Sequence, residues 1–284
     1  MVSAAVVSLL LASCGVKTTT RVPVVQQRPA KTATRGELVE AYNRQARAVR
    51  SINAAVELNP VAGGNYSGVI EDYHDVKGFI LAERPAFVRM IGQAPVVNKT
   101  VFDMASDGAE FRIFIPPKNK FIVGPADFER AGKSAIENLR PQHLVDALFW
   151  MEIPPARTVL FEEFDQSPDH FYVLTLLSES GSEIEKKVWF DRSDLSIARA
   201  QTYGAQGRLD SDVRYGEWQP AGAGAEAIYP RHIRMLRPHE DYQLEIRIQR
   251  LTLNQEIAPD RFRLEQPAGT ELVKVGLATG EKPQ

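Results

Sequence analysis

The chain has 284 residues, and its 34 Lys and Arg residues nearly balance 36 Asp and Glu residues, for a formal net charge of −2. A nucleic-acid partner would need Lys and Arg gathered into a basic patch or stripe, and none is visible along the sequence, so we exclude that class. The length suits one large domain or two small ones. The single cysteine, Cys14, has no partner within the chain, which fits a fold without disulfides.

The N-terminus carries a short apolar run over residues 4–12 that leads directly to Ser13 and Cys14. The run is too short to cross a membrane as a helix, which takes roughly 20 apolar residues, but it has the length of the apolar region of a signal peptide. Residues 11–14 resemble the lipobox of bacterial lipoproteins, although no Lys or Arg stands before the apolar run. We therefore predict a signal peptide over residues 1–13 and lipidation of Cys14. The alternative is a buried apolar strand with an incidental cysteine.

Lipidation would fix the location of the protein. The lipobox resemblance implies several acyl chains on Cys14, and two or more chains hold a protein to a bilayer stably. Gly15 follows the cysteine, at the position where an Asp would indicate retention at the inner membrane. The sequence thus predicts a protein anchored to the periplasmic face of the outer membrane. Residues 14–34, with the acylated cysteine and many Thr, Pro, Gln, Lys and Arg residues, are predicted to form a flexible tether.

A helix is predicted directly after the tether. Thr34 and Glu37 have the spacing of a capping box, in which each side chain bonds to a free amide of the first turn. Asn59 and Pro60 end the helical pattern. The apolar residues that recur at helical spacing are Leu38, Tyr42, Val49, Ile52 and Val56.

From Tyr66 onward the pattern is mostly that of strands, and Asp107-Gly108 is a strong signal for a hairpin. A helical segment is predicted from Ser134 to Met151, with Pro141 dividing it. A one-residue slip in the apolar alternation at Gln249-Arg250 predicts a β-bulge. The predicted strands are Ser67–His74, Val76–Glu83, Ala86–Gly92, Thr100–Ala105, Glu110–Ile115, Lys120–Gly124, Thr158–Phe164, Phe171–Ser178, Lys186–Asp191, Ile197–Tyr203, Leu209–Tyr215, Tyr229–Leu236 and Gln243–Asn254.

The order of these elements predicts an α+β fold. About a dozen strands form one antiparallel sheet, which curves around the leading helix and the internal helical segment. We place this domain at residues 35–267 and predict a flexible C-terminal tail at residues 268–284.

Segments that partly match catalytic or metal-binding motifs lack residues that those motifs require. Gly132-Lys133-Ser134 lacks the earlier glycine of a phosphate-binding loop, and the five histidines show neither an i, i+4 pair nor a cysteine companion for zinc. Glu162 and Glu163 are adjacent on a predicted strand, so their side chains point to opposite faces and cannot act as a pair. We therefore expect a protein that is not an enzyme, without a cofactor and without a metal.

Several segments together resemble the LolA/LolB class of lipoprotein-localisation proteins and their outer-membrane lipoprotein-sorting relatives. They are the Arg-Pro-x-x-x-Arg strand at residues 83–89, the Ser-Asp-Gly hairpin at 105–108, the apolar strand at 111–116, and the pair 188–191 and 197–200. The resemblance covers roughly Thr34 to Pro267. It implies a half-open β-barrel whose concave face is covered by helices, with an apolar cavity between them that accepts the acyl chains of a lipid or an acylated lipoprotein, and it implies no catalytic residues.

The resemblance also implies a membrane-facing loop, for which Pro95, Val96 and Val97 are the candidates; the alternative is that the valines pack under the barrel rim. Strand alternation places Phe111, Ile113 and Ile115 on one face, without showing which face is concave. Each candidate for the cavity lining could equally be ordinary core. These candidates are Phe87, Phe102, Met104, Phe111, Ile113, Phe121, Leu144 and Leu148.

Two functions follow from these observations. The first is a LolB-like localisation or lipid-carrier role, in which the cavity accepts acyl chains. The alternative is a structural or assembly lipoprotein of the cell envelope, which presents its convex sheet or rim to a protein partner and has a dry core.

Overall fold

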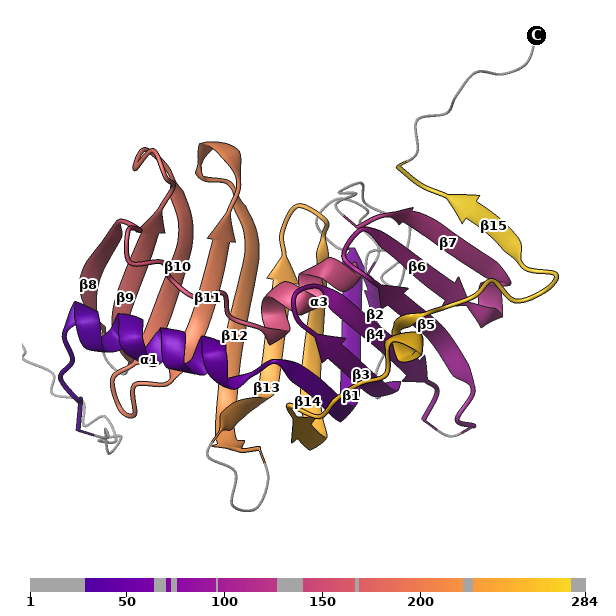
Figure 1. The fold of residues 1–284 in the computed structure, drawn as a ribbon, viewed down its shortest axis with the longest axis horizontal. Helices are drawn as coiled ribbons and strands as arrows, with labels where there is room; N and C mark the ends of the chain where they lie inside the picture. The colour runs from indigo at the N-terminus through magenta and orange to yellow at the C-terminus, as the bar shows by residue number, and fades with distance from the viewer. Residues whose placement is uncertain are drawn as a thin grey trace, which may run out of the picture.

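The computed structural model describes residues 29–63, 70–72, 76–95, 97–126, 140–166, 169–221 and 227–276. Fifteen strands in this part of the chain form one large, curved sheet (Figure 1). The strand order is β15-β7-β6-β5-β4-β3-β1-β14-β13-β12-β11-β10-β9-β8, with β2 beside β1. Strands β15 and β7 run parallel and the other neighbours antiparallel, so the sheet is mixed rather than purely antiparallel as predicted.

The strands are β1 (Ser51–Gly63), β2 (Ile70–Asp72), β3 (Val76–Glu83), β4 (Phe87–Gln93), β5 (Thr100–Ser106), β6 (Glu110–Ile115), β7 (Lys120–Pro125), β8 (Val159–Gln166), β9 (Asp169–Leu177), β10 (Ile184–Asp191), β11 (Ile197–Tyr203), β12 (Leu209–Pro220), β13 (Ile228–Arg237), β14 (Tyr242–Leu253) and β15 (Glu271–Lys274). The helices are α1 (Arg35–Ala48) and α3 (Pro141–Leu148), with short 3-10 turns η1 (Pro116–Lys118), η2 (Ala205–Gly207) and η3 (Pro259–Phe262). Strands β3, β6 and β11 have the predicted bounds. Of the predicted strand Ser67–His74, only residues 70–72 lie within the described part.

Local sequence signals determine two features of the sheet. Gly108 has a φ of 92° in the turn between β5 and β6, a conformation that glycine adopts without steric cost, and the predicted hairpin is confirmed. The predicted bulge is also confirmed: Ala55 of β1 pairs with Arg250 of β14, whereas Val56 pairs with Ile248. Gln249 is therefore the extra residue, and the apolar alternation of β14 changes register there.

The prediction that the leading helix continues to Val56 is wrong. The capping box of Thr34 and Glu37 forms as predicted, but α1 ends at Ala48 and the chain continues as β1. The apolar residues from Ile52 onward also alternate with period two, and this pattern buries every second side chain of a central strand between β14 and β3. Residues four apart, such as Ile52 and Val56, share a face in a helix and also in a strand. Pairing with neighbouring strands therefore determines that this segment is a strand.

The prediction of a flexible tail from residue 268 is also wrong for its first part. Strand β15 pairs with β7, and the Glu271 amide donates to the Asn119 carbonyl at 2.9 Å. The Asn119 side-chain amide in turn donates to the Gly269 carbonyl at 3.0 Å. This segment therefore adds an edge strand to the sheet.

Both helices lie on one face of the sheet, which we call the inner face. Helix α1 crosses in front of β9 to β12, and α3 lies in front of the middle of the sheet (Figure 1). The Tyr215 hydroxyl of β12 donates to the Ala147 carbonyl at 3.1 Å, and the Tyr229 hydroxyl of β13 donates to the Leu148 carbonyl at 2.8 Å, which secures α3. Pro141 opens α3 at a position where its missing N–H is not needed; the preceding part of the predicted helical segment lies outside the described residues.

In the described part of the chain, the opposite, outer face is covered over one half of the sheet. The C-terminal segment that contains η3 crosses β4 to β7, where the Phe262 ring packs against Phe87 with 5.6 Å between centroids. Arg89 and Arg112 donate to carbonyls of this segment, at Arg261 (3.0 Å) and Leu264 (3.1 Å). Because these two arginines alternate with buried inner-face residues along their strands, the segment lies opposite α3.

Candidate functional site

A groove of about 550 Å³ lies between α1 and the sheet. The helix contributes Leu38, Ala41 and Ala48, and the sheet contributes side chains at the ends of strands β10 to β13 that are nearest the β10–β11 turn. The apolar side chains from the sheet and this turn are Phe190, Leu195, Ile197, Trp218 and Ile228. Small-molecule sites are concave, mostly apolar and of about 300–1,000 Å³, so the groove has the size and the lining of a binding site for an apolar ligand.

The wall of the groove at Trp218 belongs to a cluster of aromatic rings. Its ring lies 5.7 Å from Trp150 and 6.4 Å from Tyr215, and its indole N–H donates to the Ile197 carbonyl at 3.1 Å. Trp150 also contacts Tyr229 edge-on at 5.7 Å. Burial raises the pKa of the Tyr229 hydroxyl, which stays protonated and keeps its bond to α3. These contacts hold the aromatic wall in one position.

Helix α1, the other wall, is attached to the body at several points. Asn43 exchanges two hydrogen bonds with the backbone of Ile153, at 2.8 and 3.1 Å. The Arg84 guanidinium donates to the Ala46 carbonyl at 2.9 Å and to the Trp150 carbonyl, and burial lowers its pKa. Ala46 belongs to the last turn of α1, so Arg84 supplies a cation and a donor where the helix presents unpaired carbonyls.

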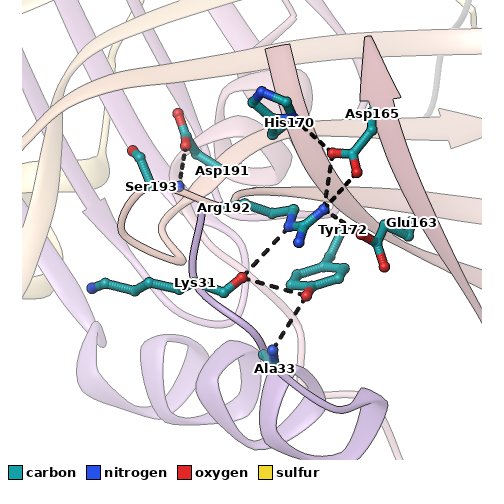
Figure 2. A network of polar contacts seen from close by, with 9 residues as sticks. All are labelled: Lys31, Ala33, Glu163, Asp165, His170, Tyr172, Asp191, Arg192 and Ser193. Atoms are coloured by element: carbon teal, nitrogen blue, oxygen red, sulfur yellow. Dashed lines mark hydrogen bonds and ion pairs between the residues drawn. The ribbon is translucent and has the colours of Figure 1, made fainter. Parts of the chain in front are cut away.

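The chain that enters α1 completes one end of the groove. Thr32 and Ala33 line it, and both belong to residues 29–34, which we call the docked segment. The Lys31 amide donates to the Arg192 carbonyl at 2.7 Å. Figure 2 shows the Lys31 carbonyl, which accepts from the Arg192 side chain at 3.5 Å and from the Tyr172 hydroxyl at 3.4 Å; this hydroxyl also accepts from the Ala33 amide at 3.4 Å. The sequence predicts a flexible tether up to residue 34, so this prediction is wrong for residues 31–33.

Arg192 is the centre of the network in Figure 2. Its side chain lies over the Tyr172 ring, 4.7 Å from the centroid, and donates to Glu163 and to both oxygens of Asp165, the latter at 2.8 and 2.9 Å. His170 bonds to the same Asp165 at 2.7 Å. The contacts to His170 and then to Arg192 lower the pKa of the Asp165 carboxyl, so it remains ionised beside the guanidinium. The network thus attaches the docked segment to strands β8 to β10.

The charged side chains that line the groove are at exposed positions. Glu37, Arg44 and Asp194 are exposed and line it, and the Gln45 side-chain amide donates to the Ile228 carbonyl at 3.0 Å. An apolar chain could therefore occupy the groove while its polar end stays in water. Among the residues that the structure describes, no group of three or more His, Cys, Asp or Glu side chains could hold a metal ion.

The eight predicted cavity residues do not line this groove, nor do they face one common space. Phe121 packs on the outer face with Ala105 and Leu264, and Phe87 contacts Phe262 there. The other six are buried in the main core on the inner face, between α3 and strands β4 to β6: Phe102, Met104, Phe111, Ile113, Leu144 and Leu148. The shared face of Phe111, Ile113 and Ile115 is confirmed as an inner, buried one.

The groove residues Phe190, Ile197, Trp218 and Ile228 were missed by sequence reasoning. Phe190 and Ile197 flank the β10–β11 turn, and that strand pair is among the segments on which the LolA/LolB resemblance rests. Apolar residues near strand ends around such a turn were the available signal, but the sequence did not show that α1 would lie over them.

The predicted membrane-facing loop joins β4 to β5. The Ala94 amide donates to the Lys99 carbonyl at 2.9 Å, and the Val97 side chain is 62% exposed; Val96 lies outside the described residues, and Pro95 is exposed too. Cys14 also lies outside the described residues, which begin at Pro29. In the described part, no helix combines the length and the apolar character that a membrane crossing needs.

Comparison with known proteins finds similarity among solved structures only. No family model matches the sequence, and no curated protein matches it. The chain is similar to a LolA superfamily protein from Nitrosomonas europaea, with 14% identity, coverage of 80% of this chain and 97% of that one, and a TM-score of 0.48. It is also similar to an outer-membrane lipoprotein-sorting protein domain from Vibrio parahaemolyticus, with 10% identity, coverage of 80% and 94%, and a TM-score of 0.48. A third similar structure is a DUF1329 family protein from Desulfovibrio piger, with 14% identity, coverage of 80% and 94%, and again a TM-score of 0.48.

Proposed function

We propose that this chain is a lipid-anchored, non-enzymatic protein on the periplasmic face of the outer membrane, and that it binds the acyl chains of a lipid or lipoprotein in the groove beneath α1. The observation that carries the proposal is the groove itself, with about 550 Å³ between apolar walls from α1 and β10–β13. Transfer of acyl CH₂ groups out of water supplies the binding energy, at about 0.8 kcal/mol for each.

The arrangement of charge supports an amphipathic ligand. The apolar side chains form the walls, while Glu37, Arg44 and Asp194 lie at the edge. A ligand of this class buries its chain and leaves its polar group in solvent, so the site needs no buried charge. Binding, rather than a chemical step, is the task that such a groove can perform.

The anchor and the loop extend the proposal to a LolB-like role. Lipidation of Cys14 would hold the body at the membrane, and the curved sheet with its helices would act as a half-open barrel. Val97, exposed in the loop between β4 and β5, would meet the bilayer. Labelling with a radioactive fatty acid tests the anchor, because Cys14→Ser should abolish incorporation and release the protein from the membrane fraction.

Native mass spectrometry tests the groove. We expect the chain with Cys14→Ser, which cannot be acylated, to carry a lipid of defined mass. Ala41→Phe places a ring inside the groove and should remove that mass. Gly36→Phe is the matched control, because it adds the same ring to the same helix at a position with nothing within 4 Å, and it should retain the lipid. A lipid that survives Ala41→Phe, or none in the parent chain, would contradict the proposal.

A further inference from the structure

Strand β8 forms an edge of the sheet that is unusually apolar. It pairs with β9 on one side, and no other strand of the described residues pairs with it. Leu160, Phe161 and Phe164 are exposed by 48%, 39% and 38%. Natural proteins shorten, cover or charge their edge strands to prevent pairing with other chains. Strand β8 carries charge, but it has eight residues and three exposed apolar side chains, so it is not short.

Among the described residues, nothing pairs with the outward-facing backbone groups of β8 beyond Val159. The Leu177 amide donates to the Thr158 carbonyl at 3.1 Å, so Thr158 and every second residue after it face β9. Phe161, Glu163 and Asp165 therefore direct their N–H and C=O groups away from the sheet. The carbonyl of Val159, which belongs to the same set, accepts from Arg35 at 3.3 Å. A stretch of five residues is thus open to an added strand.

The chemistry of this edge is apolar and acidic. Phe164 lies 6.4 Å from the Phe171 ring and 5.5 Å from Trp189, so an aromatic surface continues inward on the outer face. Three carboxylates, Glu162, Glu163 and Asp165, stand on β8, and the strand contains no Lys or Arg. Glu163 and Asp165 share one guanidinium, that of Arg192 (Figure 2), so the strand keeps an excess of negative charge.

We propose that β8 accepts an extended segment of a partner protein as an additional strand, and that this segment alternates basic and apolar residues. Main-chain hydrogen bonds to residues 161–165 would supply affinity. The basic side chains of such a segment share one face, and their charge complementarity with Glu162, which lies on the opposite face of β8 from Glu163 and Asp165, would select the partner. A second copy of this chain fits less well, because antiparallel pairing of β8 with itself about Glu163 sets this carboxylate opposite its own copy, and like charges across a ladder destabilise it. The proposal does not rest on the groove, which lies on the inner face.

Amide hydrogen exchange with two synthetic peptides tests the proposal. One peptide alternates lysine with valine and the other alternates glutamate with valine, and each is added to the full chain with Cys14→Ser. We expect the lysine peptide to slow exchange of the Phe161, Glu163 and Asp165 amides, and the glutamate peptide to leave them unchanged. Protection elsewhere only, equal protection by both peptides, or no protection would overturn the proposal. If protection of these three amides rises with protein concentration in the absence of peptide, β8 pairs with a second copy of the chain and the proposal is overturned.

Matched variants separate the backbone contribution from the charge. Phe161→Pro and Phe161→Ala both remove the ring, but only proline removes an N–H that points off the edge and not toward β9. We expect the proline variant to bind the lysine peptide about tenfold more weakly than the alanine variant, because it loses a main-chain hydrogen bond and adds a clash. Equal affinities would exclude strand addition.

Charge reversal gives a test that does not depend on the proline variant folding. Glu162→Lys should weaken binding of the lysine peptide about fivefold and create binding of the glutamate peptide, as expected for cross-strand charge pairs. If Glu162→Lys leaves the preference for the lysine peptide unchanged, the proposal that charge on β8 selects the partner is overturned. Acyl-chain binding in the groove should be the same in all these variants, so failure of one proposal is distinguishable from failure of the other.

Discussion

The two halves of the sheet differ in how they are covered. In the half from β4 to β7, α3 packs on the inner face and the C-terminal segment crosses the outer face, so both faces are buried. In the half from β8 to β13, α1 covers the inner face incompletely and leaves a groove, while Phe164 stays part-exposed on the outer face. One sheet therefore combines a half that is stabilised by packing with a half that offers surfaces for ligands.

The sharpest test of this contrast is a pair of Phe→Ala substitutions, one in each half. Phe111→Ala, in the covered half, should lower the free energy of unfolding by about 3–5 kcal/mol, because it removes a fully buried ring and leaves a cavity. Phe164→Ala, on the outer face of the other half, should cost about 1 kcal/mol, the size of an aromatic pair contact. Urea unfolding measures both values, and equal losses would remove the distinction between the halves.

Arg84 connects the two halves, and its loss should have the next largest effect. Arg84→Met keeps the aliphatic part of the side chain but removes its bonds to Ala46 and Trp150, at a cost of about 2 kcal/mol. Amides of the last turn of α1 should exchange faster. Arg47→Met is the control on the same helix, since its ion pairs to Glu40 and Glu152 are exposed to solvent and should contribute little to stability. A larger loss of unfolding free energy in Arg47→Met than in Arg84→Met would contradict this role of Arg84.

The docked segment should loosen when the network around Arg192 is broken. Arg192→Gln should speed exchange of the Lys31 amide about tenfold, whereas Arg208→Gln, which removes an exposed pair in a distant turn, should not. The pKa of Asp165 is lowered in the folded chain, so its contribution is present above the pKa of the unfolded carboxyl and is lost as pH falls through the folded value. Protection of Lys31 that persists in acid would exclude this attachment.

The smallest expected effect is a pH dependence that comes from α3. Burial, followed by the charges of Arg237 and Arg140, holds the pKa of His143 well below its ordinary value of 6.5. The unfolded chain therefore takes up this proton first, and the free energy of unfolding should decrease as pH falls below 6.5. His143→Gln should flatten this part of the pH profile, and His239→Gln, at an exposed position, should not. Identical pH profiles of stability for the parent chain and both variants would show that His143 is not the source of this pH dependence.

Local signals in the sequence were sufficient for features formed by neighbouring residues. The capping box at Thr34, the hairpin at Gly108 and the bulge at Gln249 each depend on a few adjacent positions. Strand β1 could not be recognised in this way, because Ile52 and Val56 fit the periods of helix and strand equally, and only pairing with β14 and β3 distinguishes them. The position of β15 likewise depends on a partner about 150 residues away.

The candidate site could be predicted less well than the fold. Phe190 and Trp218 resemble core residues in the sequence, and they line a groove only because α1 lies across their strands without filling the space. Phe102 and Met104 are also apolar residues that alternate with more polar ones along a strand, but α3 packs closely on that part of the sheet and buries them. How tightly a helix packs on a sheet depends on contacts between distant segments of the chain, so a local sequence pattern cannot predict it.

Fluorescence quenching by a lipid with brominated acyl chains tests the central claim directly. Trp218 lines the groove and Trp189 belongs to the outer face, so each can serve as the single tryptophan of a variant in which the other and Trp150 are replaced by Phe. We expect the brominated lipid, added below the concentration at which it forms vesicles, to quench Trp218 saturably and to leave Trp189 unquenched. Quenching of Trp189 alone, or equal quenching of both, would show that acyl chains do not enter the groove beneath α1.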